Sequence, residues 1–176
     1  MIFEEKTLSS EIVYQGTVFT IRRDQVTVVH GTSHRDIVEH PGGAAILALK
    51  DDGQVVMIRQ FRKAVEKVLL EVPAGKRDEG ESLLQTAVRE LREETGYTAG
   101  KMTLLTTMRP TPGYSDEALG IYLATDLTPG ETSFDENEAL DIIEMPLCEL
   151  RQMALAGQIE DGKTLVAILM VSASMD

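Results

Sequence analysis

Apolar and polar residues alternate along the chain in a way that predicts many short strands and three helices. Runs with a period of two, or rich in β-branched residues, predict strands, whereas apolar residues at every third or fourth position predict helices. Strands are predicted over residues 11–14, 18–29, 35–39, 44–49, 55–61, 68–72, 102–108, 119–124 and 141–144. Helices are predicted between Glu81 and Gly96 and over residues 147–156 and 164–174. This order of elements predicts an α/β fold with a mixed sheet between helical layers.

The turn residues Pro41, Gly42 and Gly43 divide the chain into two parts. Residues 1–41 hold two or three predicted strands and no helix, which predicts a small N-terminal antiparallel β unit. A sheet of this size is only marginally stable alone and needs a surface to pack on. Residues 42–176 form the second predicted domain, with the other strands and all the helices.

The first predicted helix carries an unusual group of carboxylates. At 100° per residue, Glu90, Glu93 and Glu94 share one flank of the helix. Carboxylates at this spacing repel one another, and they stand in the last turns, where the helix dipole is also unfavourable. The flank borders an apolar stripe formed by Leu83, Leu84, Ala87, Val88 and Leu91. A hard divalent cation would turn the repulsion into attraction, although a solvated acidic surface explains the three carboxylates equally well.

The surrounding residues favour the metal site. From Gly75 to Tyr97 the sequence reads GKRDEGESLLQTAVRELREETGY, with Glu81 at the start of the helix and Arg89 beside the carboxylates. At every fixed position this stretch resembles the Nudix box, the signature of the Nudix hydrolases. The resemblance implies the α/β/α sandwich with a mixed sheet that is found in this family.

Sequences outside the box resemble the ADP-ribose pyrophosphatase branch of the family. They lie at residues 35–41, 59–62, 71–75 and 111–117 and in the acidic loop 135–138. That branch has a proline about fifteen residues after the box, and Pro112 stands at this place. The resemblance implies a Mg²⁺-dependent enzyme that splits ADP-ribose into AMP and ribose 5-phosphate. Mn²⁺ is a substitute ion, and two or more ions are expected in each site.

The resemblance also implies a role for each matching residue. The metal ligands are the side chains of Glu90 and Glu94 and the backbone carbonyl of Ala74, with Glu93 close by holding a metal or its waters. Glu138 or Glu136, in the acidic loop, orients or deprotonates the attacking water. The diphosphate or the adenine end meets Arg62 and Arg35, and the terminal ribose meets Glu117. The residues that shape the motif are Gly75, Glu81 paired with Arg89, Gly96 and Pro112.

Two of these assignments have ordinary alternatives. Phe19 or Tyr14 is expected to stack on adenine, but aromatic residues in strands more often belong to the core. Arginines such as Arg35 and Arg62 are more often plain surface charges. An arginine suits a diphosphate only where the paired N–H donors of its guanidinium group are correctly placed.

Composition restricts the partners. The net charge of −12 argues against nucleic acid and against an anionic membrane surface, so substrate phosphates must be met locally by cations. Cys148 is the single cysteine, which excludes an intrachain disulfide and predicts a packing role in a reducing cytoplasm. Neither a signal peptide nor a membrane span is visible.

Three further expectations complete the interpretation. The N-terminal strands are expected to cross to a second copy, forming a homodimer in which Arg35 serves the partner's site. A Nudix pyrophosphatase for another nucleoside diphosphate sugar or nucleotide is the nearest alternative. A module that binds ADP-ribose without cleaving it is a weaker alternative, because the glutamates expected to bind metal are all present.

Overall fold

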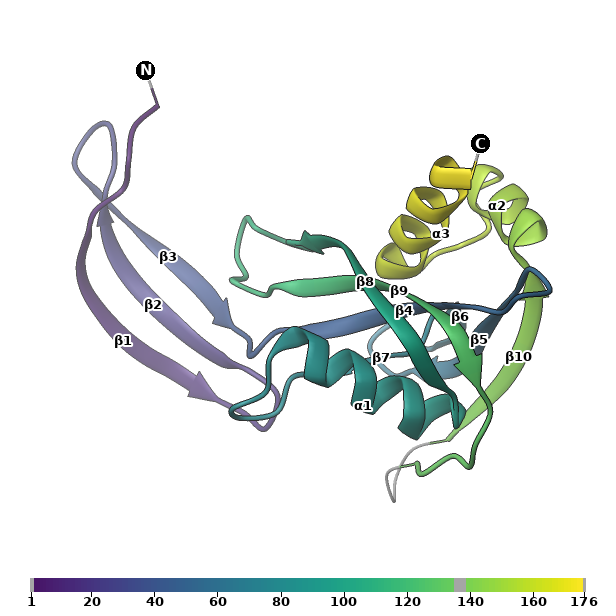
Figure 1. The fold of residues 1–176 in the computed structure, drawn as a ribbon. Coiled ribbons are helices and arrows are strands. Elements are labelled where there is room, and N and C mark those ends of the chain that lie inside the picture. Colours follow the sequence, from purple (N-terminus) through teal and green to yellow (C-terminus); the bar gives the residue numbers. More distant parts are fainter. Residues whose placement is uncertain (1, 135–138, 176) are drawn as a thin grey trace. The chain divides into compact units, whose positions relative to one another are not determined.

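The computed structural model describes residues 2–134 and 139–175 (Figure 1). The chain forms two compact units. The first unit comprises residues 1–42 and 109–118, and the second comprises residues 43–108 and 119–176.

The first unit is a three-stranded antiparallel sheet. Its strands are β1 (Thr7–Gln15), β2 (Thr20–Thr27) and β3 (Thr32–Glu39), in that spatial order. Gly31, with a φ of 89°, turns the chain between β2 and β3. The loop of residues 109–118 is tied to β3, because Val38 donates its N–H to the carbonyl of Tyr114 and accepts the N–H of Asp116.

The second unit contains a seven-stranded mixed sheet and three helices. The main strand order is β10-β5-β4-β9-β8, with β6 paired to β5 and β7 paired to β4. The pairing of β4 with β9 is parallel, and the other pairs are antiparallel. The strands are β4 (Gly43–Leu49), β5 (Gln54–Arg62), β6 (Lys67–Glu71), β7 (Ala74–Lys76), β8 (Thr98–Met108), β9 (Leu119–Thr128) and β10 (Leu140–Pro146). The helices are α1 (Leu83–Thr95), α2 (Leu147–Leu155) and α3 (Gly162–Met175).

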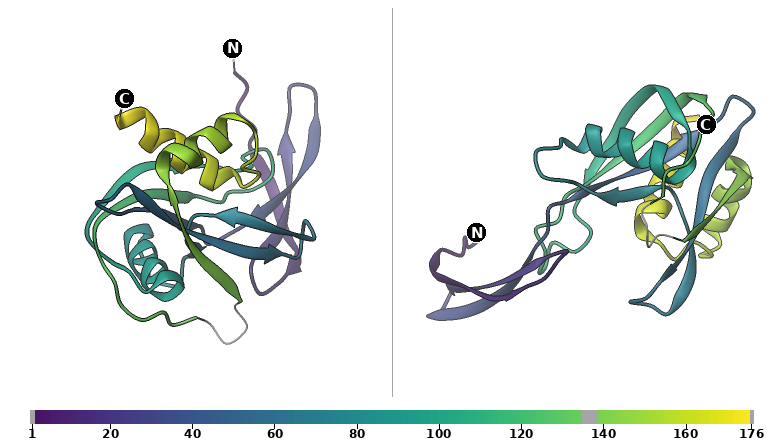
Figure 2. Two further views of the ribbon diagram at one scale, coloured as in Figure 1. Left: turned by 90° about the vertical axis from the view of Figure 1, so that its right-hand side faces the viewer. Right: turned by 90° about the horizontal axis from the view of Figure 1, so that it is seen from below.

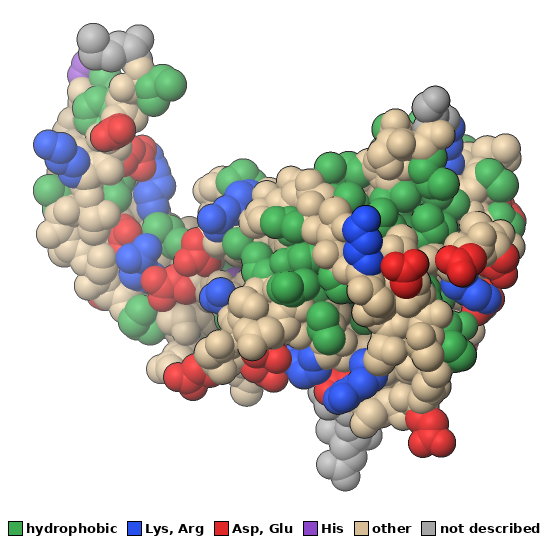
Figure 3. Space-filling model, viewed as in Figure 1, with side chains coloured by type: hydrophobic (Ala, Val, Ile, Leu, Met, Phe, Trp, Pro, Cys, Tyr) green, Lys and Arg blue, Asp and Glu red, His purple; other side chains and the backbone are tan. Residues whose placement is uncertain are grey.

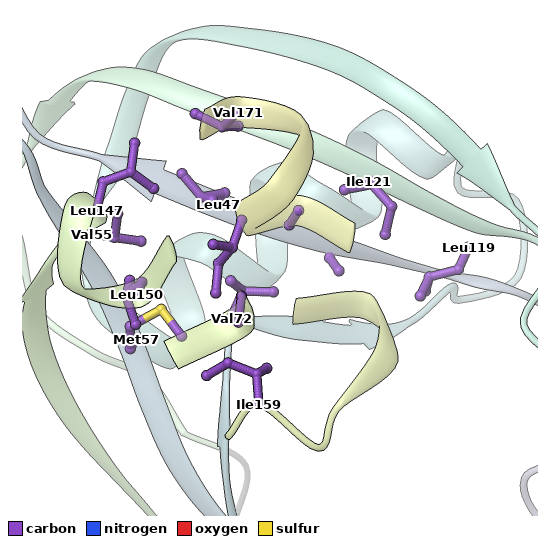
Figure 4. Packing of buried hydrophobic residues seen from close by; sticks show 14 residues of the cluster. Leu47, Val55, Met57, Val72, Leu119, Ile121, Leu147, Leu150, Ile159 and Val171 are labelled. Carbon is purple, nitrogen blue, oxygen red and sulfur yellow. The ribbon is translucent and has the colours of Figure 1, made fainter. Parts of the chain in front are cut away.

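Helices cover both faces of this sheet, with α1 on one side and α2 and α3 on the other (Figure 2). The central strand β4 is apolar throughout because both of its faces are buried. Ala45 and Leu47 join the cluster beneath α2 and α3, which Figure 4 shows around Leu47 and Val171. Ala44 and Ile46 point to the opposite face and join the cluster beneath α1. The predicted α/β sandwich with a mixed sheet is confirmed.

The helix that carries the carboxylates has well-defined ends. Ser82 accepts the backbone N–H of Gln85, and the side chain of Gln85 accepts the N–H of Ser82, which is a complete capping box. Gly96 adopts a left-handed conformation with a φ of 76° and ends the helix. The prediction that Glu81 opens the helix was wrong by two residues, because the cap formed by Ser82 starts the helix at Leu83.

The buried side of α1 also differs from the predicted stripe. Leu84 and Val88 are 45% and 51% exposed, whereas Ala87 and Leu91 are buried as expected. The buried face is completed by Thr86, Glu94 and Thr95. The helix is therefore rotated so that its carboxylate flank, rather than Leu84 and Val88, turns toward the sheet.

The single cysteine, Cys148, is exposed in α2, so the predicted packing role was wrong. Among the described residues, no helix is long and apolar enough to cross a membrane.

Candidate active site

The carboxylates of α1 face the short strand β7. Glu94 is only 2% exposed, and its Oε2 accepts the backbone N–H of Ala74 at 2.8 Å. The strand is held in place by β4, on which Ala45 lies opposite Ala74 and Ala44 lies opposite Gly75. Strand pairing thus fixes the backbone against which the helix places its acidic residues.

Gly75 allows the helix to come this close. A Cβ built on Gly75 would lie 1.8 Å from Oε1 of Glu90, far inside any acceptable contact distance. Any other residue would therefore push the Glu90 carboxylate away from the strand. The glycine at the start of the box is required by close approach, since its φ is not in the left-handed region.

Arg89 is the cation that holds the acidic residues together. Its Nε and Nη2 donate to Glu81 at 2.9 and 3.0 Å, and its Nη1 donates to Glu90 at 2.7 Å and to Glu93 at 3.1 Å. Nη2 also donates to the carbonyl of Lys76 at 3.0 Å. The expected pairing of Glu81 with Arg89 is present, and the same guanidinium offsets the repulsion between Glu90 and Glu93.

These contacts shift the pKa values of the pair. The hydrogen bonds from Arg89 lower the pKa of the Glu81 carboxyl from 4.5 to about 2, and the bond to Glu81 is the main reason that the pKa of Arg89 is raised. The folded-state pKa of Glu81 is thus below its unfolded value. The pair therefore stabilises the fold above pH 4.5, and this contribution is lost as the pH falls from 4.5 toward about 2.

A polar cavity of about 380 Å³ opens beside these groups. Its lining combines carboxylates with cations, as a site for a metal-bound phosphate requires. The lining residues are Arg62, Ala74, Gly75, Lys76, Asp78, Arg89, Glu90 and Glu93. Of the predicted site residues, the structure therefore brings Arg62 together with the residues of the box.

The donor set fits a hard divalent cation. Glu90, Glu93 and Glu94 offer carboxylate oxygens, Ala74 offers a backbone carbonyl, and the cradle at Gly75 leaves room for Glu90. In the described part of the chain, no three His, Cys, Asp or Glu side chains converge as a ready-formed metal site. Glu90 and Glu93 instead accept from Arg89, and Glu94 accepts from β7.

One buried acidic residue was missed by the sequence analysis. Glu71, at the end of β6, is fully buried and accepts two hydrogen bonds from Arg62, each of 2.7 Å. Burial alone would raise the pKa of Glu71, but Arg62 and Lys163 outweigh it and lower the pKa below its usual value. The sequence analysis matched residues 71–75 to the ADP-ribose pyrophosphatase branch but gave Glu71 no role, although it is a charged residue within the apolar run VLLEV.

The remaining predicted residues lie elsewhere. In the first unit, Arg35 pairs with Glu5, and the Glu117 carboxylate lies 3.6 Å from Nδ1 of His40. Phe19 packs on Tyr14 with ring centroids 6.0 Å apart. Their substrate contacts stay predictions, as does the role of the exposed Pro112. The proposed bases Glu136 and Glu138 fall outside the described residues.

Comparison with known proteins identifies the family. The NUDIX domain matches residues 39–167, which is most of the chain. The chain belongs to the Nudix family. This confirms the prediction of a Nudix hydrolase, and enzymes of this kind are generally metal-dependent.

Individual Nudix relatives cover nearly the whole chain. The ADP-ribose pyrophosphatase of Bacillus subtilis is 40% identical over 94% of this chain and 91% of its own length. The methanol dehydrogenase activator of Bacillus methanolicus is 41% identical over 95% of this chain and 92% of its own. A crystal structure of an ADP compounds hydrolase superposes with a TM-score of 0.85 at 24% identity, covering 99% of this chain and 96% of that one. This last likeness shows that the two proteins share a fold.

Gly75→Ala tests the close approach of α1 to β7. The added Cβ must displace the Glu90 carboxylate, so we expect hydrolysis of a nucleotide substrate to fall by roughly a hundredfold in kcat/KM. The displaced atoms belong to the end of a flexible side chain, so the free energy of unfolding should change by about 1 kcal/mol or less. Enzyme kinetics and urea unfolding measure the two quantities.

Gly162→Ala is the matched control, because a Cβ on Gly162, in α3, meets nothing within 4 Å. It should leave kcat/KM unchanged and raise the free energy of unfolding by about 1 kcal/mol or less, because the added Cβ reduces the freedom of the unfolded chain. Wild-type kcat/KM in the Gly75→Ala variant would show that the position of Glu90 does not matter for hydrolysis.

Proposed function

We propose that this protein is a Mg²⁺-dependent pyrophosphatase that cleaves ADP-ribose into AMP and ribose 5-phosphate. The observation that carries the proposal is the carboxylate face of α1, which adjoins a cavity also lined by Arg62. The 40% identity to the ADP-ribose pyrophosphatase of Bacillus subtilis supports the choice of substrate. We place the reaction in the cytoplasm, since a chain with one cysteine forms no intrachain disulfide.

The residues of the second unit divide the work. Glu90 and Glu94, with the carbonyl of Ala74, would hold two or more Mg²⁺ ions, for which Mn²⁺ can substitute, and Glu93 would hold a further ion or its waters. When bound, such ions neutralise the charge of the diphosphate and lower the pKa of water. Arg62 would bind the diphosphate, because a guanidinium fork donates paired hydrogen bonds to phosphate oxygens in a fixed geometry.

The general base and the remaining substrate contacts are assigned to residues of the acidic loop and of the first unit. We assign the general base to Glu138 or Glu136, in the acidic loop. A carboxylate of ordinary pKa suffices for this role, since the metal makes the water easier to deprotonate. Arg35, Glu117 and Phe19, of the first unit, would meet the diphosphate or adenine end, the terminal ribose and the adenine ring.

A second candidate is a Nudix pyrophosphatase for a different nucleoside diphosphate compound. It is favoured by the GDP-mannose pyrophosphatase of Yersinia pestis, which is 31% identical over 85% of this chain and 79% of its own length. The residues proposed to bind metal and diphosphate would serve either enzyme equally, so the two candidate functions differ in the substrate and not in the mechanism.

Incubation with ADP-ribose tests the first candidate. We expect AMP and ribose 5-phosphate to form with Mg²⁺, more slowly or equally with Mn²⁺, and not at all with chelator, because the carboxylates alone cannot neutralise the diphosphate. Chromatography of the products measures the reaction, and other sugar nucleotides form the comparison panel. Faster cleavage of another compound would support the second candidate, and binding of ADP-ribose without any cleavage would contradict both.

Separate substitutions distinguish the two proposed bases. Glu136→Gln and Glu138→Gln each remove one carboxylate while keeping its size. Removal of the base should lower kcat by roughly a hundredfold to ten-thousandfold, whereas the other substitution should change it much less. Steady-state kinetics at saturating Mg²⁺ gives the comparison, with Glu131→Gln, an exposed residue that precedes the acidic loop, as control. Equal and small effects at both positions would show that the base lies elsewhere.

We also propose that the protein is a homodimer with exchanged N-terminal strands. All nine residues of β1 are exposed, and this strand forms an edge of its sheet. Hydrophobic side chains lie among charged ones on this sheet (Figure 3). In β1 and the turn that follows it, the hydrophobic side chains that are at least 39% exposed are Leu8, Ile12, Val13, Tyr14, Val18 and Phe19. A second copy would bury this surface and pair the free edge, and it would let Arg35 serve the partner's site.

Sedimentation tests the dimer. The wild type should sediment at twice the 19.4 kDa of one chain, and Ile12→Asp in β1 should shift it toward the monomer by placing a charge on the interface. Leu155→Asp is the control, because Leu155 is 70% exposed in α2 of the second unit. A wild-type protein that is monomeric and fully active would refute the proposal.

A further inference from the structure

Glu71 is a buried carboxylate shared by two cations. Arg62 donates to it twice, from Nε to Oε1 and from Nη2 to Oε2, both at 2.7 Å. Lys163, near the start of α3, donates to the same Oε2. Glu71 itself is fully buried, while the side chain of Arg62 is 39% exposed and lines the cavity beside Glu90 and Glu93.

The carboxylate is also anchored by residues at the start of α3. Lys163 also donates to Asp161 at 2.9 Å, and Asp161 accepts the backbone N–H of Thr164 at 2.9 Å. The hydroxyl of Thr164 in turn accepts the N–H of Val72, the residue after Glu71, at 2.8 Å. The start of α3 and the end of β6 are therefore tied together, and Glu71 has little freedom to move.

Stability alone does not explain this arrangement. Burying a carboxylate is costly, and apolar residues of similar volume often stabilise a fold as well as a buried ion pair does. The pair does, however, restrict an arginine that would otherwise sample many rotamers. Glu71 uses two of the five N–H donors of Arg62, so three are not used by Glu71.

We propose that Glu71, anchored by Lys163, is a positioning residue that presents the guanidinium of Arg62 to the diphosphate of the substrate. The proposal rests on the function given above, in which Arg62 meets the diphosphate. A guanidinium already fixed before binding loses little rotamer entropy when the substrate arrives, and this strengthens binding. Lys163 keeps the carboxylate charged, so that both bonds to Arg62 persist.

The first test makes the same Glu→Gln substitution at two positions, one buried and one exposed. Glu71→Gln should raise KM for the cleaved nucleotide by roughly tenfold or more, because it weakens charge-assisted hydrogen bonds, and should change kcat by less than about threefold. Glu160→Gln is the control, since Glu160 pairs with Lys67 of the same strand at 2.9 Å but in an exposed position. It should leave both constants unchanged. Equal KM values in the two variants would overturn the proposal.

A double variant separates positioning from general stabilisation. If Glu71 acts through Arg62, KM in Glu71→Gln/Arg62→Lys should equal KM in Arg62→Lys alone. Effects that simply add would mean that Glu71 acts independently of Arg62, and the proposal would fail. These kinetic tests use whichever nucleotide the wild type cleaves. If ADP-ribose is not the substrate, the tests of Glu71 can therefore still succeed or fail on their own.

A measurement on the wild type covers the case in which Glu71→Gln does not fold. The Nε–H of Arg62 should give a slowly exchanging NMR signal, because it is held by a buried carboxylate. Arg92, whose side chain is 60% exposed, gives the reference rate. Slow exchange at Arg62 relative to Arg92 supports the proposal, and equal rates overturn it.

Discussion

Mutual repulsion among the carboxylates of α1 is the constraint on which the site depends. Glu90, Glu93 and Glu94 lie within one turn of each other, and Glu94 is also buried. Arg89 offsets two of these charges, and a backbone N–H of β7 meets the third. Arg89 lies on the same helix, and Ala74 lies on a strand paired with β4, so both partners are supplied by elements packed beside the acidic residues.

The two helical layers both contribute to the cavity, although only one of them lines it. From one face of the sheet, α1 supplies the carboxylates directly. From the other face, α3 supplies Lys163, which reaches the site only through Glu71 and Arg62. The sheet between them is therefore more than a support, because β5, β6 and β7 carry the residues that connect the layers.

Much of the fold could be predicted from periodicity, and the limits of the prediction have physical causes. The 100° step correctly placed Glu90, Glu93 and Glu94 on one flank of α1. It could not show which side of the helix meets the sheet, so Leu84 and Val88 were wrongly expected to be buried. That choice depends on the missing side chain of Gly75, which lets the acidic flank approach β7. The strand β7 itself is only three residues long and has no periodic pattern to detect.

Glu71 was missed for a different reason. A glutamate at the end of a strand is ordinarily a surface residue, and the apolar run VLLEV around Glu71 does not show which residues pair with it. Its burial arises from contacts that are distant in sequence, with Arg62 nine residues before it and Lys163 ninety-two residues after it. Such a pairing is a property of tertiary packing, so the residue proposed to position Arg62 was visible only once the fold was known.

The same reasoning limits what the cavity can select. A diphosphate is common to every nucleoside diphosphate sugar, so a group proposed to meet only the diphosphate, such as Arg62, would bind all of these compounds alike. Discrimination requires contacts to the base or to the second sugar, where a missing hydrogen-bond partner is costly. Two relatives of equal similarity carry different names, although this chain matches both along nearly its whole length. Selectivity must therefore come from residues other than the carboxylates and Arg62, which explains why the motif predicts the chemistry better than the substrate.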